Sequence, residues 1–580
     1  MTSSRADFII DLLPNGSLAV SFPYDLTALQ VVRSVPGRRW HKDNKFWEVP
    51  RTSLKALSAQ AARVGIGVAL SERVRQALNL GRERQQKLLA VKTDVTPLQL
   101  PTNTNPYAFQ YAGIRFAKYA LHSFHGALIG DCMGLGKSFE ALSLVVLHEK
   151  LSKVLILCPA TLKYTWAGQI DEHYPQLSYT IIDGSPEQRS EQWAAPSRIK
   201  IANYELLVPG HDRNCTGSNA EKRKAGHKCN CQALSKDIDL RLQEWDLVIA
   251  DELAAYLKSF KAQRTKRAKK IRRKYTLGLS GIFLENNLDE LHSVIDFIIP
   301  GLLGPGYLFH EQHVVRNQWG VTIGWRGIED IKQRIAPYYI RRTKNEVLSE
   351  LPPKVYNDVL IEMSAAEWEL YDDIRNQIRE KIKDNPKLTI SNILTELLRL
   401  KQAACDPRLL DVEGIESSKL AAVRDIMAAA GEHKVVLYTF FAQLAKLLAA
   451  ELTAPLIAGG VAIKDRAKII AEFQAGQYPC LVSTDAGAYG ITLTAADIII
   501  HVDLPWNPAK MRQREDRLHR IGQKGSVQVV SLICRRTVDE KIRGILHRKL
   551  QLVKSVLDEE LPEDNTGSIT KDELLQLLED

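Results

Sequence analysis

The sequence predicts an α/β fold with two parallel-sheet lobes, an α-helical inset and a small α+β N-terminal module. Short β-branched apolar runs are each followed by ten or more residues with helical spacing, an alternation typical of parallel sheets. The alternation occurs in two series, which are separated by a helix-rich stretch from about residue 288 to 419. The N-terminal residues instead show paired short strands around turns.

Two hairpins are predicted in the N-terminal module. Residues 8–10 and 18–22 are apolar and flank a Pro-Asn-Gly turn, while residues 39–40 and 46–47 flank a polar turn. Residues 81–104 are mostly polar, so we expect them to form a linker.

Each lobe is expected to contain buried parallel strands joined by right-handed crossovers. The predicted strands are residues 127–129, 154–157, 199–201 and 247–250 in the first lobe and residues 435–438, 481–482, 498–502 and 527–533 in the second. Pro352 and Pro353 cannot continue a helix, so residues 341–354 are expected to be a pivot. The predicted domains are the module at 1–80, the linker at 81–104, lobe 1 at 105–305, the inset and inter-lobe hinge at 306–418, lobe 2 at 419–560 and a tail helix at 561–580.

Composition excludes several classes of protein. Of 580 residues, 45% are hydrophobic and 25% are charged, which is the globular average and excludes wholesale disorder. No apolar run approaches the roughly 18–20 residues that span a bilayer, no secretion signal is apparent, and eight cysteines are too sparse for a disulfide scaffold. The net charge of +10 favours a polyanionic partner. We therefore expect a soluble, monomeric protein of a reducing compartment that does not bind membranes.

A Gly-rich segment after the first predicted strand of lobe 1 is a candidate phosphate site. Its glycines let backbone N–H groups close around phosphate oxygens, and the helix that follows adds the positive end of its dipole. Lys137 would reach the β- and γ-phosphates of ATP, and the Ser138 hydroxyl would hold Mg²⁺. The predicted ATP contacts are Asp131, Cys132, Met133, Gly134, Leu135, Gly136, Lys137 and Ser138. Asp131 stands where the general pattern has a glycine, and the alternative is an ordinary Gly-rich turn.

Two adjacent carboxylates, Asp251 and Glu252, follow the predicted strand 247–250, at the edge where open parallel sheets bind ligands. We expect Asp251 to complete the Mg²⁺ shell and Glu252 to orient and deprotonate the attacking water. The alternative is a helix start or a solvated pair.

Arg517 and Arg520 are three residues apart, so we expect them to share one face of a helix. Two guanidinium groups on one face can clamp a transferring phosphoryl group, whereas the alternative is a solvated basic helix. The predicted catalytic residues are therefore Lys137, Asp251, Glu252, Arg517 and Arg520.

A dense basic run covers residues 258–274, which contain ten Lys or Arg and no acid. Such a patch would neutralise DNA phosphates without reading sequence, and Lys258, Arg264, Lys266 and Arg267 are the predicted contacts. The alternatives are a solvated helix face and a nuclear targeting tract.

A polar insert before residue 247 contains His211 and a group of residues that could bind zinc. Cys215, Cys229, Cys231 and His227 would give a tetrahedral site with soft ligands. The alternative is that these cysteines are reduced loop thiols.

In its motifs the chain resembles the Swi/Snf family of superfamily-two helicase-like ATPases, which translocate along duplex DNA. Phe109-Gln110 is similar to the Q motif, residues 131–138 to Walker A, and residues 340–354 to the inter-lobe hinge. Pro159, Leu162 and Trp166 resemble motif Ia and residues 203–205 the following DNA-facing motif, while residues 481–490, 503–508 and 513–523 resemble motifs of the second lobe. The likeness covers about residues 105–560.

The resemblance implies two RecA-like lobes with ATP and Mg²⁺ between them. It implies that Gln110 reads adenine, that Gly487 and Gln513 contact ATP, and that Lys163, Asn203, Tyr204, Ser483, Thr484 and Trp506 contact DNA. Residues 35–47 resemble the HARP module of annealing helicases, which would suit branched DNA.

The expected function is a DNA-dependent ATPase that translocates along double-stranded or branched DNA and remodels DNA or protein–DNA complexes, including forks or annealing strands. Motif II continues as Leu253-Ala254, and motif III reads Ser280-Gly281-Ile282-Phe283, where the family prefers Thr-Gly-Thr-Pro. These departures affect the coupling of hydrolysis to lobe motion. The alternatives are a strand-separating helicase, which would use the same ATP site, and a coupling-impaired DNA-binding relic, which the altered motifs II and III suggest. The compact size predicts a bacterial or viral source, hence cytoplasm or nucleoid, or the nucleus in a eukaryote.

Overall fold

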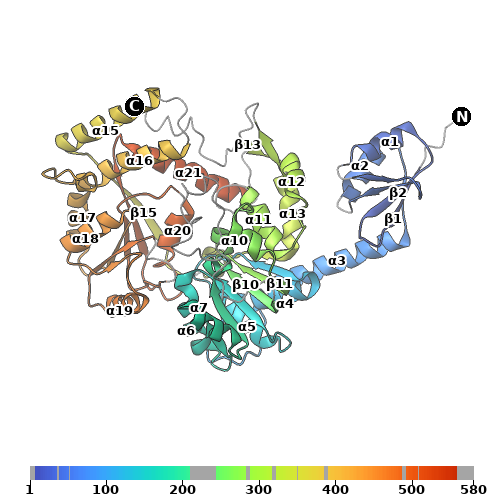
Figure 1. Cartoon of the computed structure of the whole chain (residues 1–580), viewed down its shortest axis with the longest axis horizontal. Helices are drawn as coiled ribbons and strands as arrows, with labels where there is room; N and C mark the ends of the chain where they lie inside the picture. The colour runs from blue at the N-terminus through green and yellow to red at the C-terminus, as the bar shows by residue number, and fades with distance from the viewer. Residues whose placement is uncertain are drawn as a thin grey trace. The chain divides into compact units, whose positions relative to one another are not determined.

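The computed structural model describes residues 7–35, 38–50, 53–208, 243–281, 288–316, 322–348, 350–384, 390–485, 491–506 and 508–557. The chain divides into two compact units, residues 1–93 and residues 94–580 (Figure 1). The second unit contains both parallel-sheet lobes.

The N-terminal unit is a five-stranded sheet of order β3-β4-β2-β1-β5 with helices packed on it. Its elements are β1 (Phe8–Leu12), β2 (Leu18–Ser21), α1 (Leu26–Arg33), β3 (Arg39–His41), β4 (Phe46–Val49), α2 (Leu54–Arg63), β5 (Val68–Leu70) and α3 (Glu72–Thr93). Both predicted hairpins are confirmed, since β1 pairs antiparallel with β2 and β3 pairs antiparallel with β4. In the second hairpin Trp40 lies opposite Trp47, with ring centroids 5.2 Å apart.

The first half of the predicted linker is helical. α3 continues through Gly81 to Thr93, so only residues 94–107 connect the units without helix or strand. The polar residues between Arg82 and Lys92 are mostly Arg, Glu, Gln and Lys, which are good helix formers. High polarity was thus a poor guide to irregular structure in this segment.

Lobe 1 is a seven-stranded parallel sheet of order β14-β6-β11-β10-β7-β9-β8. The strands are β6 (Gly126–Ile129), β7 (Val154–Cys158), β8 (Tyr179–Ile181), β9 (Ile199–Asn203), β10 (Glu244–Asp251), β11 (Arg272–Leu279) and β14 (Tyr339–Ile340). Every residue of β6, β7 and β9 is buried, so both faces of the sheet are covered. The lobe's longer helices are α4 (Ala108–Phe124), α5 (Lys137–Leu147), α6 (Lys163–His173), α7 (Pro186–Ala194) and α11 (Leu288–Ile298).

The central strand β11 was not predicted from the sequence. It lies between β6 and β10, but its first residues, Arg272, Arg273 and Lys274, continue the basic run and conceal the strand pattern. Arg273 is accommodated because its guanidinium donates to the carbonyls of Ile271 (2.9 Å) and Phe297 (2.5 Å).

The predicted helical inset contains strands that belong to the sheets of both lobes. Near its start are α12 (Gly306–His313), β12 (Val314–Arg316), β13 (Thr322–Trp325) and α13 (Ile328–Ile335). β14 then pairs with β6 of lobe 1, and after α14 (Lys344–Val347) the strand β15 (Lys354–Ile361) pairs with β20 (Val527–Cys534) of lobe 2. Residues 339–361 therefore connect the two sheets directly.

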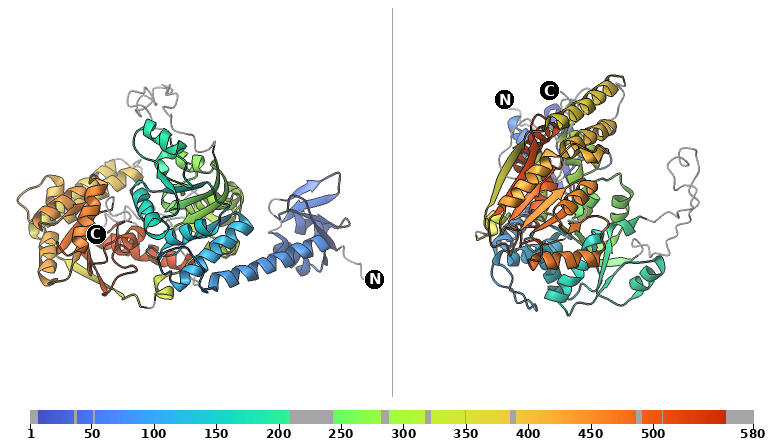
Figure 2. Two further views of the ribbon diagram at one scale, coloured as in Figure 1. Left: turned by 90° about the horizontal axis from the view of Figure 1, so that it is seen from below. Right: turned by 90° about the vertical axis from the view of Figure 1, so that its left-hand side faces the viewer.

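Lobe 2 is a six-stranded parallel sheet of order β15-β20-β19-β16-β18-β17, whose strands run side by side with helices alongside (Figure 2). Its other strands are β16 (Val435–Thr439), β17 (Leu456–Ile457), β18 (Cys480–Thr484) and β19 (Ile498–His501). Its helices are α15 (Ala365–Asp384), α16 (Ile390–Cys405), α17 (Ser418–Ala429), α18 (Ala442–Glu451), α19 (Ile463–Gln474), α20 (Pro508–Glu515) and α21 (Val538–Leu557). The predicted tail helix lies outside the described residues. Within the described residues, no helix has the length and apolar character needed to cross a membrane.

Candidate active site

The phosphate loop joins β6 to α5, as the sequence predicts. Gly134 and Gly136 have φ angles of +85° and +83°, in the left-handed region that side chains other than glycine rarely adopt. A Cβ at Gly136 would also lie 2.3 Å from Nε2 of Gln110. The glycines therefore allow a tight loop that leads into the N-terminus of α5, a location that favours anions.

The ammonium group of Lys137 lies inside this loop. It donates to the carbonyl oxygens of Asp131 (2.8 Å) and Cys132 (3.3 Å), and the side chain is buried. Ser138 follows in the first turn of α5. A buried cation beside a helix N-terminus provides the charge that a triphosphate requires.

Asp251 ends β10 and lies beside Lys137. Its Oδ2 accepts from Nε1 of Trp166 at 2.9 Å, its carbonyl accepts from the Tyr204 hydroxyl at 2.8 Å, and only 7% of the residue is exposed. Burial raises the pKa of Asp251, while the Trp166 hydrogen bond and the charge of Lys137 counteract that rise. Glu252 follows with a φ of +49°, which turns the chain sharply after the strand.

Arg517 and Arg520 approach lobe 1 from lobe 2, but not on a helix. The expected shared helical face is wrong, because α20 ends at Glu515 and both arginines lie in the turns that follow. Burial raises the pKa of both Asp251 in lobe 1 and Tyr438 in lobe 2, and the charge of Arg517 counteracts part of each rise, so Arg517 is within electrostatic range of both lobes. Its buried Nε has no hydrogen-bond partner among the described residues.

Arg520 packs on the phosphate loop. A Cβ at Gly134 would lie 2.7 Å from the Cβ of Arg520, so a larger residue at 134 would collide with it. Arg520 donates to the Thr492 hydroxyl at 2.7 Å. Burial and the neighbouring Arg517 lower the pKa of Arg520 to about 10.

These residues fit a Mg²⁺-bound nucleoside triphosphate. The buried Nε of Arg517, which has no partner among the described residues, and the ammonium of Lys137 are cationic donors from the two lobes. The Ser138 hydroxyl and the Asp251 carboxylate are oxygen ligands of the kind that Mg²⁺ prefers. Lys137, Asp251, Arg517 and Arg520 are thus brought together as the sequence predicts.

Two other predicted nucleotide contacts have protein partners. Gln110 is buried: its Oε1 accepts from the Tyr107 amide (2.9 Å), and its Nε2 donates to the Leu135 carbonyl (3.1 Å), so it fastens α4 to the phosphate loop. Asp131 is fully buried, and its carboxylate is ion-paired with Arg342, so it has a protein partner instead of an exposed face for a ligand. Gln513 lies on α20, and Gly487 lies outside the described residues.

Several predicted DNA contacts are buried. The Lys163 ammonium donates to the Ile182 carbonyl at 2.9 Å and pairs with Asp183 at 3.1 Å. Tyr204 has no exposed surface and stacks on Tyr256, so this placement does not support a direct DNA contact. The remaining candidates of this group are placed as follows: Asn203 is buried at the end of β9, Ser483 and Thr484 are buried at the end of β18, and Trp506 is half-buried on the lobe 2 core.

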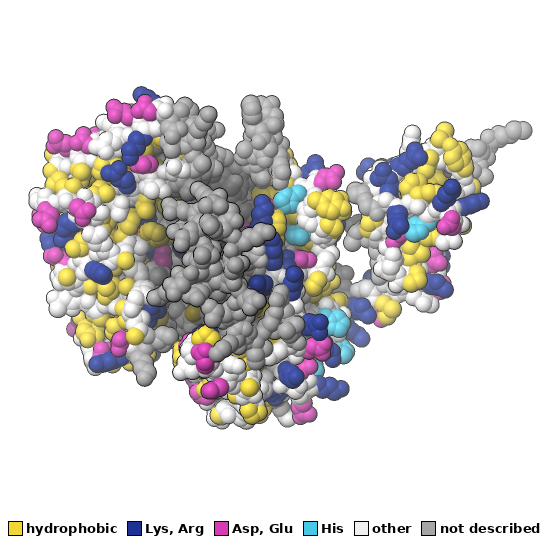
Figure 3. Space-filling view, viewed as in Figure 1, with side chains coloured by type: hydrophobic (Ala, Val, Ile, Leu, Met, Phe, Trp, Pro, Cys, Tyr) yellow, Lys and Arg dark blue, Asp and Glu magenta, His cyan; other side chains and the backbone are white. Residues whose placement is uncertain are grey.

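The basic run lies on the surface of lobe 1. In Figure 3 dark blue side chains gather over the region of α10 (Gln263–Ala268) and α11. Lys266 is exposed, whereas Lys258 pairs with Glu290 (3.6 Å) and Arg264 lies 5.2 Å from the Tyr256 ring centroid. Arg267 donates to the Leu207 carbonyl at 3.4 Å. Part of this charge is thus already paired within the lobe.

The proposed zinc ligands Cys215, His227, Cys229 and Cys231 lie outside the described residues, as does His211. Across the described ranges, no group of three or more His, Cys, Asp or Glu side chains is arranged to hold a metal ion.

Sequence reasoning missed two residues at the site, Arg342 and Lys344. Both belonged to the segment interpreted only as a hinge, yet both are buried: Arg342 bonds Asp131 of the phosphate loop, and Lys344 bonds Asp516 beside Arg517. The one available signal was the density of cations, Arg341-Arg342-Thr343-Lys344, in a segment that connects two lobes.

Two parallel-sheet lobes, with a phosphate loop on one and arginines from the other against it, define a helicase-like ATPase core. Comparison with known families agrees: residues 65–409 match the SNF2-related domain, and residues 418–522 match the helicase conserved C-terminal domain. Because the first match covers more than half of the chain, the protein belongs to the SNF2-related family.

Individual relatives are longer than this chain. An uncharacterised ATP-dependent helicase of Mycoplasma genitalium, MG018, is 30% identical over 486 residues, covering 81% of this chain and 44% of the relative. The TATA-binding protein-associated factor MOT1 of Saccharomyces cerevisiae is 25% identical over 610 residues, covering 88% of this chain and 31% of the relative. This chain thus spans less than half the length of these two proteins. Among solved structures, the Sulfolobus solfataricus SWI2/SNF2 ATPase core in complex with dsDNA is 26% identical, with coverage of 83% of this chain and 99% of that one and a TM-score of 0.39.

Proposed function

We propose that the protein hydrolyses ATP and uses the resulting lobe movement to translocate along double-stranded DNA. The observation that carries the proposal is the meeting of the lobes at one site, where Arg517 acts on Asp251 and Arg520 packs on Gly134. Hydrolysis that depends on groups from both lobes is possible only when the lobes are closed together.

Each residue has a role that its position supports. Lys137 and the N-terminus of α5 bind the phosphates, and Glu252 orients and deprotonates the attacking water. Arg517 and Arg520 stabilise the charge that develops on the transferred group. Mg²⁺ would neutralise phosphate charge, and Ser138 and Asp251 would hold it.

Three features favour DNA as the track. The chain carries a net charge of +10, the basic run lies on lobe 1, and the family is helicase-like. Contacts to the phosphate backbone suit a translocase, which must accept every sequence register in turn. The N-terminal unit, whose Trp40 and Trp47 pair beside basic residues, would suit branched DNA and hence fork remodelling or annealing.

The deciding experiment measures ATP turnover with duplex, forked and single-stranded DNA in parallel, with Lys137→Ala as the negative control. We expect duplex or forked DNA to raise turnover by about tenfold or more, and Lys137→Ala to abolish it. Absence of DNA-stimulated turnover in the unaltered chain would instead identify a DNA-binding relic.

A strand-separating helicase is the second candidate, favoured by the name of the Mycoplasma genitalium relative. It would use the same ATP site, so turnover does not discriminate. A displacement assay on a labelled partial duplex does: a duplex translocase leaves the strands paired, while a strand-separating enzyme releases the labelled strand.

A further inference from the structure

The short segment from Tyr339 to Lys344 contacts both halves of the candidate ATP site. Tyr339 and Ile340 pair in parallel with Leu128 and Ile129 of β6, so the chain leaves the sheet beside the phosphate loop. The backbone contacts continue into the loop: the Gly130 amide donates to the Ile340 carbonyl at 2.7 Å, and the Cys132 amide donates to the Arg342 carbonyl at 3.1 Å.

Arg342 binds the phosphate loop and the helix that follows it. Its guanidinium is ion-paired with Asp131 and Glu140, two carboxylates with no exposed surface, and it also donates to the Phe109 carbonyl. Its backbone amide and Nε donate to Oδ1 of Asp131 at 2.9 and 3.0 Å. Burial raises the pKa of Glu140 well above its usual value, and Arg342 counteracts part of that rise. One side chain thus joins Asp131 in the loop to Glu140 in the first turn of α5.

Lys344 holds the turn that carries Arg517. Its ammonium donates to Oδ1 of Asp516 at 2.7 Å and to the carbonyl of His519, so it bonds the residues on either side of the arginine. Lys354 supports the same turn through Glu515 at 2.8 Å, and His519 donates to the Pro352 carbonyl at 2.7 Å. The turn has no helix to fix it, since α20 ends before it.

Arg342 and Lys344 are two residues apart, which in extended backbone is about 7 Å. Movement of the turn that carries Arg517 therefore acts on the segment that holds the phosphate loop. We propose that Arg342 and Lys344 are positioning residues for ATP hydrolysis: Arg342 sets the phosphate loop, and Lys344 sets Arg517 against it. This proposal rests on the proposed ATPase function.

The test combines Lys344→Gln with Arg517→Ala in a double-mutant cycle on the full chain. Lys344→Gln is expected to lower kcat for DNA-stimulated ATP turnover by about tenfold or more and to leave KM for ATP within about threefold. If Lys344 acts through Arg517, the double variant is no slower than Arg517→Ala alone. Lys381→Gln, which removes an exposed lysine paired with Glu396 at 3.2 Å, is the matched control and should leave both constants unchanged.

Independent, multiplicative losses in the double variant would overturn the role of Lys344, as would a raised KM with kcat preserved. Lys344→Arg keeps the charge, and restored turnover in that variant supports positioning even if Lys344→Gln melts at a lower temperature. No turnover in the unaltered chain refutes the proposed function and this proposal together, whereas turnover with multiplicative losses refutes only this one.

Arg342 is tested through the nucleotide. Arg342→Lys keeps one charge but cannot bond both carboxylates, so we expect KM for ATP to rise about tenfold because the loop loses its support. An unchanged KM would remove Arg342 from the proposal. Asp131→Asn weakens the same ion pair by removing the carboxylate charge. If Arg342→Lys does not fold, KM for ATP is measured in Asp131→Asn instead.

Discussion

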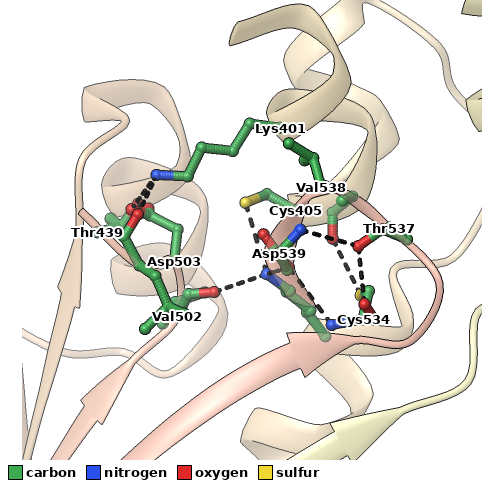
Figure 4. Close-up of polar contacts among 12 residues, drawn as sticks. Lys401, Cys405, Thr439, Val502, Asp503, Cys534, Thr537, Val538 and Asp539 are labelled. Carbon is green, nitrogen blue, oxygen red and sulfur yellow. Dashed lines mark hydrogen bonds and ion pairs between the residues drawn. The ribbon is translucent and has the colours of Figure 1, made fainter. Parts of the chain in front are cut away.

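Both lobes bury charged side chains, but one group of ion pairs joins elements within lobe 2, and the other joins elements of the two lobes at the candidate ATP site. In lobe 2, Lys401 pairs with Asp503 at 3.1 Å (Figure 4), and Lys419 pairs with Asp539 at 2.6 Å. All four side chains are almost completely buried. The first pair joins α16 to the segment that follows β19, and the second joins α17 to the start of α21, all within lobe 2. The pairs of Arg342 and Lys344 instead join the phosphate loop, the inter-lobe segment and the arginine turn.

The hydrogen-bond partners of a buried charge distinguish a structural ion pair from a group that is available to a ligand. Burial alone would raise the pKa of Asp503, yet the charges of Lys401 and Arg514 and a hydrogen bond from Thr439 hold it below its usual value. Both oxygens of that carboxylate accept hydrogen bonds within the lobe, from Lys401, Thr439 and the Phe440 amide. Arg517, by contrast, keeps a buried Nε without a partner among the described residues.

The largest expected effect on ATP turnover comes from removing Arg517. Arg517→Ala should lower ATP turnover by about 10³-fold, because an arginine brought to the phosphates stabilises charge that appears only in the transition state. The melting temperature of the protein should change little, because the Arg517 Nε has no partner among the described residues. Steady-state turnover and thermal melting check both, and Arg512→Ala, five residues earlier on α20, is the control. A stable variant with normal turnover would contradict the role of Arg517.

The next largest effect is the loss of folding stability expected when one of the buried ion pairs of lobe 2 is broken. Lys419→Met leaves Asp539 buried without its cation and should destabilise the protein by about 3–5 kcal/mol. The combined change Lys419→Met with Asp539→Leu should recover most of that loss, since no charge is then left unpaired. Denaturant unfolding measures both. A loss below about 1 kcal/mol for the single change would show that the pair is not needed.

A smaller effect is expected from the basic surface of lobe 1. Lys266→Ala should weaken duplex binding by a few-fold whatever the sequence, and should reduce the slope of log affinity against log salt by about one. Binding titrations over a range of salt concentrations test this. Lys468→Ala, an exposed lysine on α19, serves as the control, and equal slopes for all three proteins would exclude a contact at Lys266.

The smallest effect concerns pH. Burial lowers the pKa of His519 to about 4, so the folded protein keeps this imidazole neutral while the unfolded chain takes up a proton below about pH 6.5. The neutral imidazole therefore costs the folded state no stability above about pH 6.5. As the pH falls from 6.5 toward 4, protonation of the unfolded chain lowers the free energy of unfolding. Melting temperatures at pH 7, 6 and 5 should fall less for His519→Gln than for the unaltered chain.

Much of the architecture could be predicted because buried parallel strands are apolar throughout. All eight predicted strand segments of the lobes lie in observed strands, although β19 ends at His501, one residue earlier than expected. Five strands of the lobes were not predicted. Charged and polar residues interrupt the pattern of β11 and β15, and β8, β14 and β17 are only two or three residues long. At the site, loop glycines and strand-end carboxylates follow from local backbone requirements. The partners of Arg342 could not be predicted, because the sequence does not reveal which acids a cation meets 200 residues away.

The edge position of β14 has a consequence for how the site is assembled. Asp131 and Arg342 are 211 residues apart along the chain, so a ribosome makes the phosphate loop long before the side chain that neutralises it. Until then Asp131 and Glu140 have no guanidinium between them. An N-terminal fragment meant to contain the complete phosphate loop must therefore extend beyond Arg342, and a fragment that ends earlier should leave Asp131 and Glu140 without their guanidinium partner.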